Sequence, residues 1–409
     1  MKKKIPLAWY RCPLCGHKEF EVLYVNPAAP ALVSPQLLAW DVVTSVCTHC
    51  GLVQSNPRPR PQLAAKIYGQ LQTAVDPNEL AGEPPKLTGQ ALAIRKEQAD
   101  YLASIPEINA GAAVLDIGCN HGFLLHELKL RGFETWGIEP DPILAAKAQS
   151  RGLRVITAFY ENFRFAPESF DVITAFHVLE HTHDPRAFLK KARNELKQDG
   201  LLIVEVPDLS KPNAEKLDDF FNTQHIFHFT PTSLASLLEH IGFEPVETLE
   251  MSYYAFRILA RKTNRRSRRT HDPDEVERAR RIVQSYKAAR LRTLTRISEI
   301  IAQTMNGLKP SESIAIWGAG KHTYELLRLT PLAQHKRFVF VDSSPQTQRH
   351  GFMGFAVLDP SELPRMSPEL VVISSYAFQD EIALRLRDMG FADDRILKLY
   401  DEVKTYDGM

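Results

Sequence analysis

The sequence predicts an α/β protein made of several parts. Its 409 residues are too many for one ordinary core, because a domain commonly holds roughly 100 to 200 residues. Strand and helix patterns alternate over residues 112–262 and again from about residue 313, which is typical of parallel, doubly wound sheets. The first strand of each series ends in a glycine turn. We expect an N-terminal cysteine segment, a first α/β domain with a helical lead-in, a linker helix and a second α/β domain (residues 1–60, 61–262, 263–309 and 310–409).

Four of the five cysteines form two C-x-x-C pairs, Cys12 with Cys15 and Cys47 with Cys50. Pairs ~30 residues apart are better explained by four thiolates around a tetrahedral zinc ion than by disulfides, since a reducing compartment keeps thiols free. A thioredoxin-like redox pair is the alternative, but that motif sits in a βαβ unit, and none surrounds either pair. We therefore expect a structural zinc site, because four thiolates leave no open position for a substrate.

The spacing of apolar residues predicts the elements of the first α/β domain. A polar helix over about 62–71 follows the proline-rich stretch 55–61, and a helix from about residue 86 leads into a buried strand at 112–118. Further strands are expected near residues 134–138, 153–157, 170–175 and 200–206, with helices over 141–151 and 185–197. Two strands over about 243–249 and 253–261 predict an antiparallel hairpin at the sheet edge.

A charged segment over residues 273–303 predicts the linker helix. Asp272 is a candidate N-cap, and Asp274 and Glu275 lie in the first turn, where the helix dipole favours acidic side chains. The basic run Arg265, Arg266, Arg268 and Arg269 precedes this helix and is interpreted as a solvated face of the linker.

Composition predicts a soluble, cytoplasmic protein with no nucleic-acid or membrane partner. The formal net charge of +1 provides no overall attraction for nucleic acid. No apolar run approaches the ~20 residues that cross a bilayer, and no apolar region follows the basic start of the chain, which argues against a secretory signal. We expect a monomer or a homodimer.

The glycine turn of the first α/β domain indicates a nucleoside-containing cofactor. It reads Asp116-x-Gly118-x-x-x-Gly122, and glycine lets the backbone approach a ligand at the bare N-terminus of a helix. Glu139 ends the next strand, 23 residues after Asp116, where its carboxylate can accept hydrogen bonds from both ribose hydroxyls.

Together with the strand and polar loop over residues 169–181, these motifs resemble class I S-adenosylmethionine (SAM)-dependent methyltransferases over roughly residues 88–262. The resemblance implies a Rossmann-like domain in which Asp116, Gly118 and Gly122 shape the methionine side of the SAM site and Glu139 holds the ribose. The other cofactor candidates are Cys119, Asn120, Phe159, which lies near the expected adenine position, and Phe176. A dinucleotide-binding dehydrogenase is the alternative, but its G-x-G-x-x-G pattern would need glycine in place of Asn120.

The loop over residues 220–231 is the richest candidate for catalysis, since His225, His228 and Gln224 among aromatic residues can form a desolvated polar pocket. The alternative is that the aromatic residues pack in the core and the histidines are satisfied there. We expect a structural role for His181, and His183 is interpreted as a loop residue.

The whole chain resembles zinc-containing sugar C-methyltransferases that act on nucleotide-linked keto-deoxysugars. In that family a Glu-His pair in this loop deprotonates the carbon beside the ketone, and a tyrosine after the zinc segment contributes. Here the pair is Gln224-His225, and Tyr68 is the nearest tyrosine. Glutamine cannot take a proton, so the role of base falls on His225, with His228 as a second candidate. The resemblance implies a nucleotide-linked sugar as acceptor, while O- and N-methylation of another small molecule stay open.

A second glycine turn, Trp317-Gly-Ala-Gly-Lys-His-Thr, follows a buried strand of the C-terminal domain, and Asp342 ends the next strand. Backbone amides there can hold a diphosphate and a carboxylate can bind a ribose. The substrate-binding candidates are Gly318, Gly320, Lys321, His322 and Asp342. Thr323 replaces the third glycine of the dinucleotide fingerprint, which argues against NAD. A purely structural C-terminal domain and an adaptor protein with a degenerate SAM site are the remaining alternatives.

Overall fold

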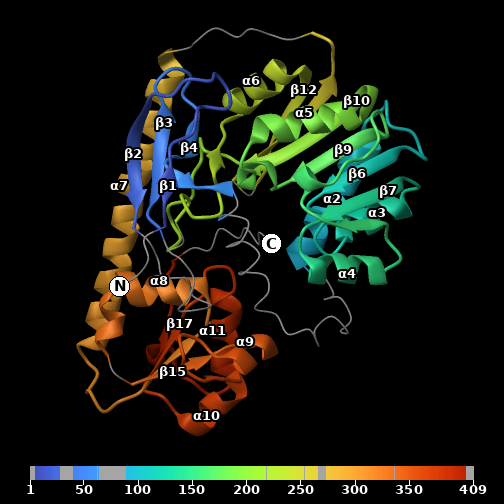
Figure 1. Ribbon diagram of the computed structural model, residues 1–409. Coiled ribbons are helices and arrows are strands. Elements are labelled where there is room, and N and C mark those ends of the chain that lie inside the picture. The colour runs from blue at the N-terminus through green and yellow to red at the C-terminus, as the bar shows by residue number, and fades with distance from the viewer. Residues whose placement is uncertain are drawn as a thin grey trace.

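The computed structural model describes residues 5–27, 40–61, 63, 89–217, 219–252, 254–265, 273–335 and 337–401. They form an N-terminal module, a central domain and a C-terminal domain, with one long helix that runs beside the first and reaches the last (Figure 1). Several sequence predictions lie outside the described residues: Tyr68, Asp272, most of the polar helix over 62–71, and the basic residues 266–269.

The central domain is built on a seven-stranded sheet in the order β12-β13-β10-β9-β6-β7-β8. The strands from β10 to β8 run parallel, whereas β13 is antiparallel to both β10 and β12. In chain order the strands are β6 (Ala113–Ile117), β7 (Glu134–Glu139), β8 (Val155–Thr157), β9 (Phe170–Phe176), β10 (Leu196–Pro207), β12 (Phe243–Glu250) and β13 (Ala255–Lys262). The predicted strands and the edge hairpin are therefore confirmed.

Helices cover both faces of this sheet, because successive side chains of a strand point to opposite sides. Leu115 lies in the core cluster shared with α5 and α6, whereas its neighbour Val114 lies in the cluster shared with α2 and α3. The helices of the domain are α2 (Gly89–Ser104), α3 (Phe123–Leu130), α4 (Pro142–Ser150), α5 (Pro185–Glu195) and α6 (Pro231–Ile241), with short 3-10 turns η2 (Tyr160–Asn162) and η3 (Leu179–His181).

The turn between β6 and α3 requires glycine at two positions. Gly118 and Gly122 have φ angles of 71° and 74°, a region that other residues rarely adopt. A Cβ atom at Gly118 would meet the Val178 side chain at 2.6 Å, and one at Gly122 would meet the Leu153 side chain at 2.5 Å. The Val178 and Leu153 side chains therefore pack closely against the turn and hold it at the carboxyl edge of the sheet.

The N-terminal module is an antiparallel sheet that borrows a strand from the central domain. Its order is β11-β4-β3-β2, and β11 pairs Phe227 with Gln54 and His228 with Val53. The cysteine segment expected over residues 1–60 is thus extended by a strand from a distant loop. Its strands are β2 (Phe20–Asn26), β3 (Val42–Cys47), β4 (Val53–Ser55) and β11 (Phe227–His228), and the short strands β1 (Leu7–Ala8) and β5 (Arg58–Pro59) form a separate pair.

The predicted linker helix is confirmed as α7 (Pro273–Met305), and it contributes to two cores. Val283 packs with Val46 of β3 in one cluster, and Ile301 packs with residues of the C-terminal sheet in another. Arg280 forms an ion pair with Glu21 at 2.7 Å. The helix therefore fixes the C-terminal domain relative to the N-terminal module (Figure 1).

The C-terminal domain has five parallel strands in the order β16-β15-β14-β17-β18. They are β14 (Ile314–Trp317), β15 (Phe338–Val341), β16 (Val357–Leu358), β17 (Leu370–Ile373) and β18 (Ile396–Leu397). The connecting elements are α8 (Lys321–Leu329), η4 (Pro331–Gln334), α9 (Pro345–His350), η5 (Pro360–Glu362), α10 (Leu363–Met366), α11 (Gln379–Asp388) and η6 (Asp393–Arg395).

Asp219, in the loop between β10 and α6, joins three parts of the chain. Its buried carboxylate accepts hydrogen bonds from the hydroxyls of Tyr24 (2.6 Å) and Tyr286 (2.9 Å) and forms an ion pair with Arg290 at 3.2 Å. Two residues earlier, Leu217 lies in the core cluster of the C-terminal domain. This loop, which carries the candidate catalytic histidines, is therefore held by the N-terminal module, α7 and the C-terminal domain.

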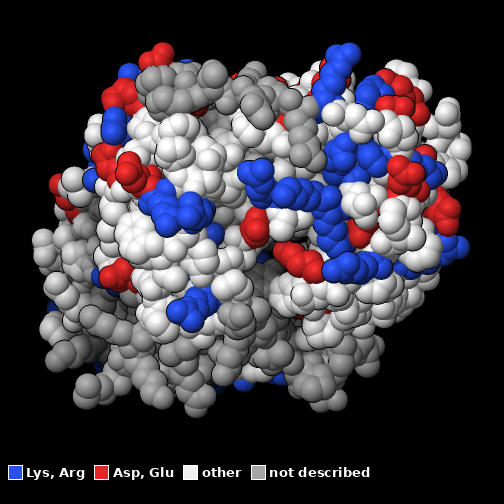
Figure 2. Space-filling model, turned by 45° about the horizontal axis from the view of Figure 1, so that its top comes forward, with Lys and Arg blue, Asp and Glu red and all other residues white. Residues whose placement is uncertain are grey.

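Within the described part of the chain, no helix is both long and apolar enough to cross a membrane. On the face shown in Figure 2, Lys and Arg side chains cross the middle of the surface and are interspersed with Asp, Glu and uncharged residues. Charges of both signs on this face agree with the formal net charge of +1.

Candidate active site

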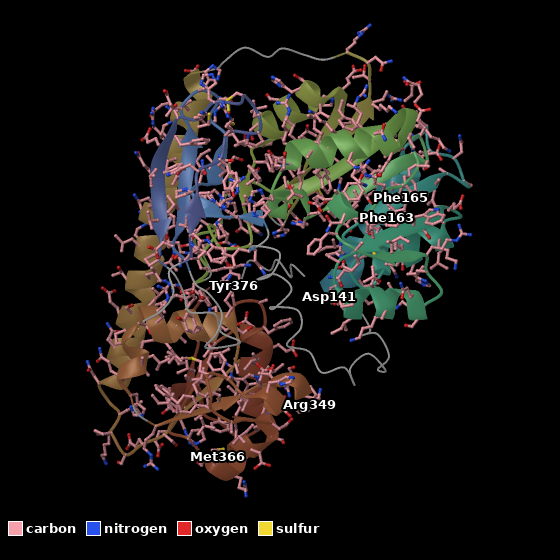
Figure 3. The ribbon with its side chains drawn as sticks, in the orientation of Figure 1. Asp141, Phe163, Phe165, Arg349, Met366 and Tyr376 are labelled. Carbon is pink, nitrogen blue, oxygen red and sulfur yellow. The ribbon has the colours of Figure 1, made fainter. Side chains whose placement is uncertain are left out.

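One large cavity, of about 2020 Å³, is lined by all three parts of the chain. Glu139 and His225 of the central domain, Ser55 of the N-terminal module, and Tyr376 and Asp342 of the C-terminal domain all contribute to its wall. In Figure 3, Tyr376 and Asp141 lie on the C-terminal and the central domain respectively, on either side of the space between these domains.

Glu139 ends β7 at this cavity, and its carboxylate is held by backbone amides. The N–H of Asn120 donates to Oε2 and the N–H of Asp141 donates to Oε1, both at 2.9 Å. Burial raises the pKa of Glu139 to about 6, although these two donors lower it. An ionised carboxylate has four lone-pair positions, so two amides leave acceptor capacity for ligand hydroxyls.

Asp116 lies at the end of β6, below the glycine turn. Its Oδ1 accepts a hydrogen bond from the Thr174 hydroxyl at 2.7 Å, and burial raises its pKa to about 6. The structure brings most of the sequence-predicted cofactor residues to one side of the cavity, where they line its wall; these are Asp116, Gly118, Cys119, Asn120, Glu139, Phe159 and Phe176. Gly122 caps α3 immediately behind them.

His225 lines the cavity on a loop that is fastened on two sides. The N–H of Ile226 donates to the carbonyl of Glu180 at 2.8 Å, and the carbonyl of Ile226 accepts from the N–H of Ser55 at 2.7 Å. Burial lowers the pKa of His225 well below its ordinary value, and the nearby His181 lowers it further. The imidazole is therefore neutral near pH 7 and able to accept a proton.

A cluster of histidine and glutamate side chains surrounds His225. The rings of His181 and His225 are 5.0 Å apart, and one donor atom from each of Glu180, His181 and His225 lies within 4.8 Å of the other two. His177 lies between two buried carboxylates, with Nδ1 3.5 Å from Glu180 and Nε2 3.2 Å from Glu205. Burial lowers the pKa of His177, but these two carboxylates raise it more, to about 9.

The four cysteines of the N-terminal module converge. Cys12 and Cys50 have their sulfur atoms 3.5 Å apart, as do Cys15 and Cys47, and all four sulfurs lie within 4.8 Å of one another. The residue after each pair is glycine at positive φ, Gly16 at 82° and Gly51 at 76°. None of the four is in a disulfide, so the donor set fits a closed tetrahedral thiolate site.

The glycine turn of the C-terminal domain repeats the geometry of the turn at Gly118. The N–H of Ala319 donates to Asp342 Oδ2 at 2.9 Å and that of Ser344 donates to Oδ1 at 2.8 Å, as Asn120 and Asp141 do to Glu139. Gly318 has a φ of 109°, and a Cβ atom there would meet the Ser374 carbonyl oxygen at 2.6 Å. Gly318, Gly320, Lys321, His322 and Asp342 all line the cavity.

A family model described as a methyltransferase domain matches residues 91–248, which include the Gly118 turn, Glu139 and His225. The chain is a SAM-dependent methyltransferase. A second family model, described as "C2185-like, N-terminal", matches residues 311–397 of the C-terminal domain of this methyltransferase.

Curated relatives match about two-fifths of the methyltransferase. The ubiquinone biosynthesis O-methyltransferase of Xylella fastidiosa (strain 9a5c) is 29% identical over 190 residues, which cover 42% of this chain and 77% of that protein. The protein of the same name from Xanthomonas euvesicatoria pv. vesicatoria (strain 85-10) is 27% identical and covers 42% and 79%. Among solved structures, a SAM-dependent methyltransferase from Mesorhizobium loti is 16% identical, covers 42% of this chain and 100% of that one, and has a TM-score of 0.37.

The predicted catalytic residues of the methyltransferase differ in their exposure and in whether they line the cavity. Gln224 is exposed, and its backbone carbonyl accepts a hydrogen bond from His181 Nδ1 at 2.9 Å. His228 is buried against the Phe220 and Phe221 rings and is absent from the residues that line the cavity; burial lowers its pKa to about 3. Tyr68 lies outside the described residues. His225 is therefore the best placed of the candidates.

Sequence reasoning missed Glu180 and His177. A structural role was expected for His181 alone and a loop position for His183, but the 3-10 turn η3 that contains His181 also brings the buried carboxylate of Glu180 within 4.8 Å of His225. His322 is also more constrained than expected, because its Nδ1 lies 2.9 Å from the Ser374 hydroxyl and its Nε2 lies 2.6 Å from the Tyr400 hydroxyl. Only the folded chain brings these partners together.

Proposed function

We propose that this methyltransferase transfers a methyl group from SAM to a nucleotide-linked keto-deoxysugar and that His225 is the general base. The observation that carries the proposal is the continuity of one cavity from Glu139, past His225, to the glycine turn at Gly318. Ligand pockets commonly hold roughly 300 to 1,000 Å³. A cavity of about 2020 Å³ has room for a nucleoside cofactor and a second, comparably large ligand.

The two ends of the cavity support two nucleoside ligands. Glu139 is the last residue of the parallel strand β7 and Asp342 directly follows the parallel strand β15, and each is held by two backbone amides, which orients the carboxylate for ribose hydroxyls. At the C-terminal end, the N-terminus of α8 and the exposed Lys321 offer backbone amides and positive charge to a diphosphate. We assign this end to the nucleotide of the acceptor.

SAM supplies an electrophilic methyl group on a sulfonium when it is bound, so the chain has to position a nucleophile and remove its proton. Neutral His225 can take the proton from the carbon beside the ketone, and that carbon then forms the new carbon–carbon bond as the carbon–sulfur bond breaks. The proton resides on the His225 imidazole until solvent removes it. Exposed Gln224 can orient the acceptor through hydrogen bonds but cannot take the proton.

The four-cysteine cluster is proposed to hold one structural Zn²⁺. Its thiolates would close the coordination sphere, so zinc would stabilise the module without entering the reaction. Because β4 of this module begins three residues after Cys50 and pairs with β11, the site supports the loop that carries His225.

O-methylation is the second candidate, because the relatives reported above are named O-methyltransferases. Carbon and oxygen acceptors differ in one observable: a carbon acid bound beside a base exchanges its proton with solvent. The experiment incubates the enzyme, without SAM, with nucleoside-diphosphate-linked keto-deoxysugars in deuterium oxide and follows exchange by NMR. A second arm adds SAM and locates the methyl group by mass spectrometry.

Exchange at the carbon beside the ketone in the wild type, its loss in His225→Ala and a new carbon-bound methyl group support the proposal. Methylation of a hydroxyl-bearing acceptor without any exchange assigns the enzyme to O-methylation. Wild-type exchange in His225→Ala overturns the role of His225 as base.

A further inference from the structure

Glu180 has a buried carboxylate, and among the described residues neither of its oxygens makes a hydrogen bond of good geometry; Oε1 has only the longer ion-pair contacts, 3.5 Å to His177 Nδ1 and 3.8 Å to His181 Nε2. Its side chain is 1% exposed, yet the residue contributes to the wall of the cavity. Nδ1 of His225 is likewise buried without a partner, and a carboxylate oxygen of Glu180 lies within 4.8 Å of a ring nitrogen of His225. Burying polar groups without hydrogen bonds costs free energy, so the acceptor capacity that these long contacts leave on Glu180, beside the unpaired Nδ1 of His225, calls for a functional explanation.

The backbone holds the two residues in fixed relation. Glu180 lies in η3, and its carbonyl accepts the N–H of Ile226 at 2.8 Å, directly after His225. His181 Nδ1 lies 2.9 Å from the Gln224 carbonyl, so this nitrogen carries the hydrogen and the ring is fixed. The loop is thus attached to η3 at Gln224 and at Ile226, on both sides of His225, which limits how far the backbones of Glu180 and His225 can separate.

The carboxylate of Glu180 is ionised, because a chain of alternating charges stands behind it. Burial raises its pKa, but His181 and then His177 lower it more, so that the net pKa is below its usual value. His177 is held in turn by Glu205, and Glu205 forms an ion pair with Arg257 at 2.7 Å. His177, Glu205 and Glu180 all line the cavity, and Glu180 lies within 4.8 Å of His225.

We infer that Glu180 is a positioning residue that orients His225 and stabilises the imidazolium formed when His225 takes a proton from the acceptor. The inference rests on the proposed role of His225 as base. A small rotation of either side chain, or one bridging water, spans the remaining distance. Position 224, where the resembling family has a carboxylate, is glutamine in this chain, and Glu180 supplies a negative charge beside His225 from η3 instead. Four ionisable side chains face His225: Glu180, His181, His177 and His228.

The experiment compares Glu180→Gln, Glu180→Asp and His225→Ala with the wild type in the same methylation assay, with SAM at saturation and the acceptor varied. Glu180→Gln keeps the shape and removes the charge, so we expect kcat to fall by about 10², with KM within about threefold. Glu180→Asp restores the charge and should be at least about tenfold faster than Glu180→Gln. The control is Glu134→Gln, an exposed carboxylate at the opposite end of the sheet, which should retain wild-type kcat.

The pH profile separates this role from a purely structural one. Glu180 raises the pKa of His225, so Glu180→Gln should move the acid limb of the kcat profile to lower pH. SAM affinity, measured by calorimetry, should stay within about threefold and shows that the variant is folded. A wild-type kcat in Glu180→Gln, or a loss of activity with an unmoved acid limb, overturns the inference about Glu180. In either case an inactive His225→Ala would still support the proposed role of His225 as general base.

A metal ion is the other chemistry that Glu180, His181 and His225 could share. Elemental analysis of the wild type and of Glu180→Gln therefore accompanies the assay. A metal ion in excess of the one expected at the cysteines, lost on substitution of Glu180, overturns the positioning role. Equal metal content in the two proteins supports it.

Discussion

The Ser55 hydroxyl donates a hydrogen bond to the backbone carbonyl of His225 at 3.2 Å, and the Ser55 N–H donates to the carbonyl of Ile226 at 2.7 Å. Ser55 ends β4 of the N-terminal module, five residues after Cys50. The cysteine cluster therefore lies at the base of a strand that holds the candidate general base in place. This contact links the four-cysteine cluster to the candidate base, and the first prediction follows from it.

The protein should contain one zinc ion per chain when it is purified without added metal, and Cys47→Ala should lose it. Elemental analysis measures the content, and Cys119→Ser, which removes a cysteine outside the cluster, is the matched control that should keep it. Loss of zinc should lower turnover more than SAM affinity, because β4 supports the His225 loop. Zinc near zero in folded wild-type protein would exclude the proposed site.

Glu139→Ala should weaken SAM binding at least about tenfold, since loss of a charged hydrogen-bond acceptor costs roughly 1.5 to 3 kcal/mol. Calorimetric titration measures the affinity. Glu134→Gln, at the other end of the same strand β7, is exposed and should bind SAM as the wild type does. An unchanged affinity in folded Glu139→Ala would place the ribose elsewhere.

His225→Ala should lower turnover by roughly 10² to 10⁴ with little change in SAM affinity, because a general base acts on the transition state. Gln224→Ala should lower it less, since an exposed amide can only orient the acceptor. Gln224→Glu should preserve or raise the rate of solvent exchange of the acceptor proton if the acceptor is carbon. Turnover and exchange are measured on the same samples, and equal losses in His225→Ala and Gln224→Ala would contradict the distinct roles.

His177 should make stability depend on pH. Its pKa rises from an ordinary 6.5 to about 9 in the fold, so its charged form stabilises the folded protein fully below pH 6.5, and this contribution is lost as pH rises through about 9. Its upper bound is about 3 kcal/mol. Urea unfolding at pH 6 and pH 10 should show that His177→Gln is destabilised mainly at pH 6. The exposed His350→Gln serves as control, and a pH-independent difference for His177→Gln would contradict the assignment.

Lys321→Ala and Asp342→Ala should raise KM for a nucleotide-linked acceptor about tenfold or more and change kcat little, because in the proposed site they would bind a part of the acceptor remote from the reacting atom. Steady-state kinetics with a nucleoside-diphosphate-linked keto-deoxysugar measures both constants. Lys309→Ala, an exposed lysine before β14, is the control for loss of positive charge. An unchanged KM in both variants would favour a purely structural C-terminal domain.

The local patterns of the sequence were sufficient for the strands of the first α/β domain and for the strands on either side of the Gly318 turn in the second, but not for β16, β18 or α11. Buried strands such as Ala113–Ile117 and Phe170–Phe176 follow from a side-chain periodicity that the backbone sets. Gly118 and Gly318 have positive φ angles that other residues rarely adopt, so a glycine in the sequence indicates the turn. The convergence of the four cysteines was also predictable, because two C-x-x-C pairs at this spacing are typical of one tetrahedral four-thiolate site.

The candidate catalytic site depended on contacts that no local pattern records. His228 and His225 lie three residues apart in one loop, yet only His225 lines the cavity, because β11 pairs with a strand about 170 residues earlier and buries His228. Glu180 became a partner of His225 only when η3 and that loop were brought together by a backbone hydrogen bond. The sequence by itself determined strands, turns and the thiol set, since these follow from neighbours along the chain. The tertiary structure decided which histidine and which carboxylate face the cavity, since that depends on packing between distant segments.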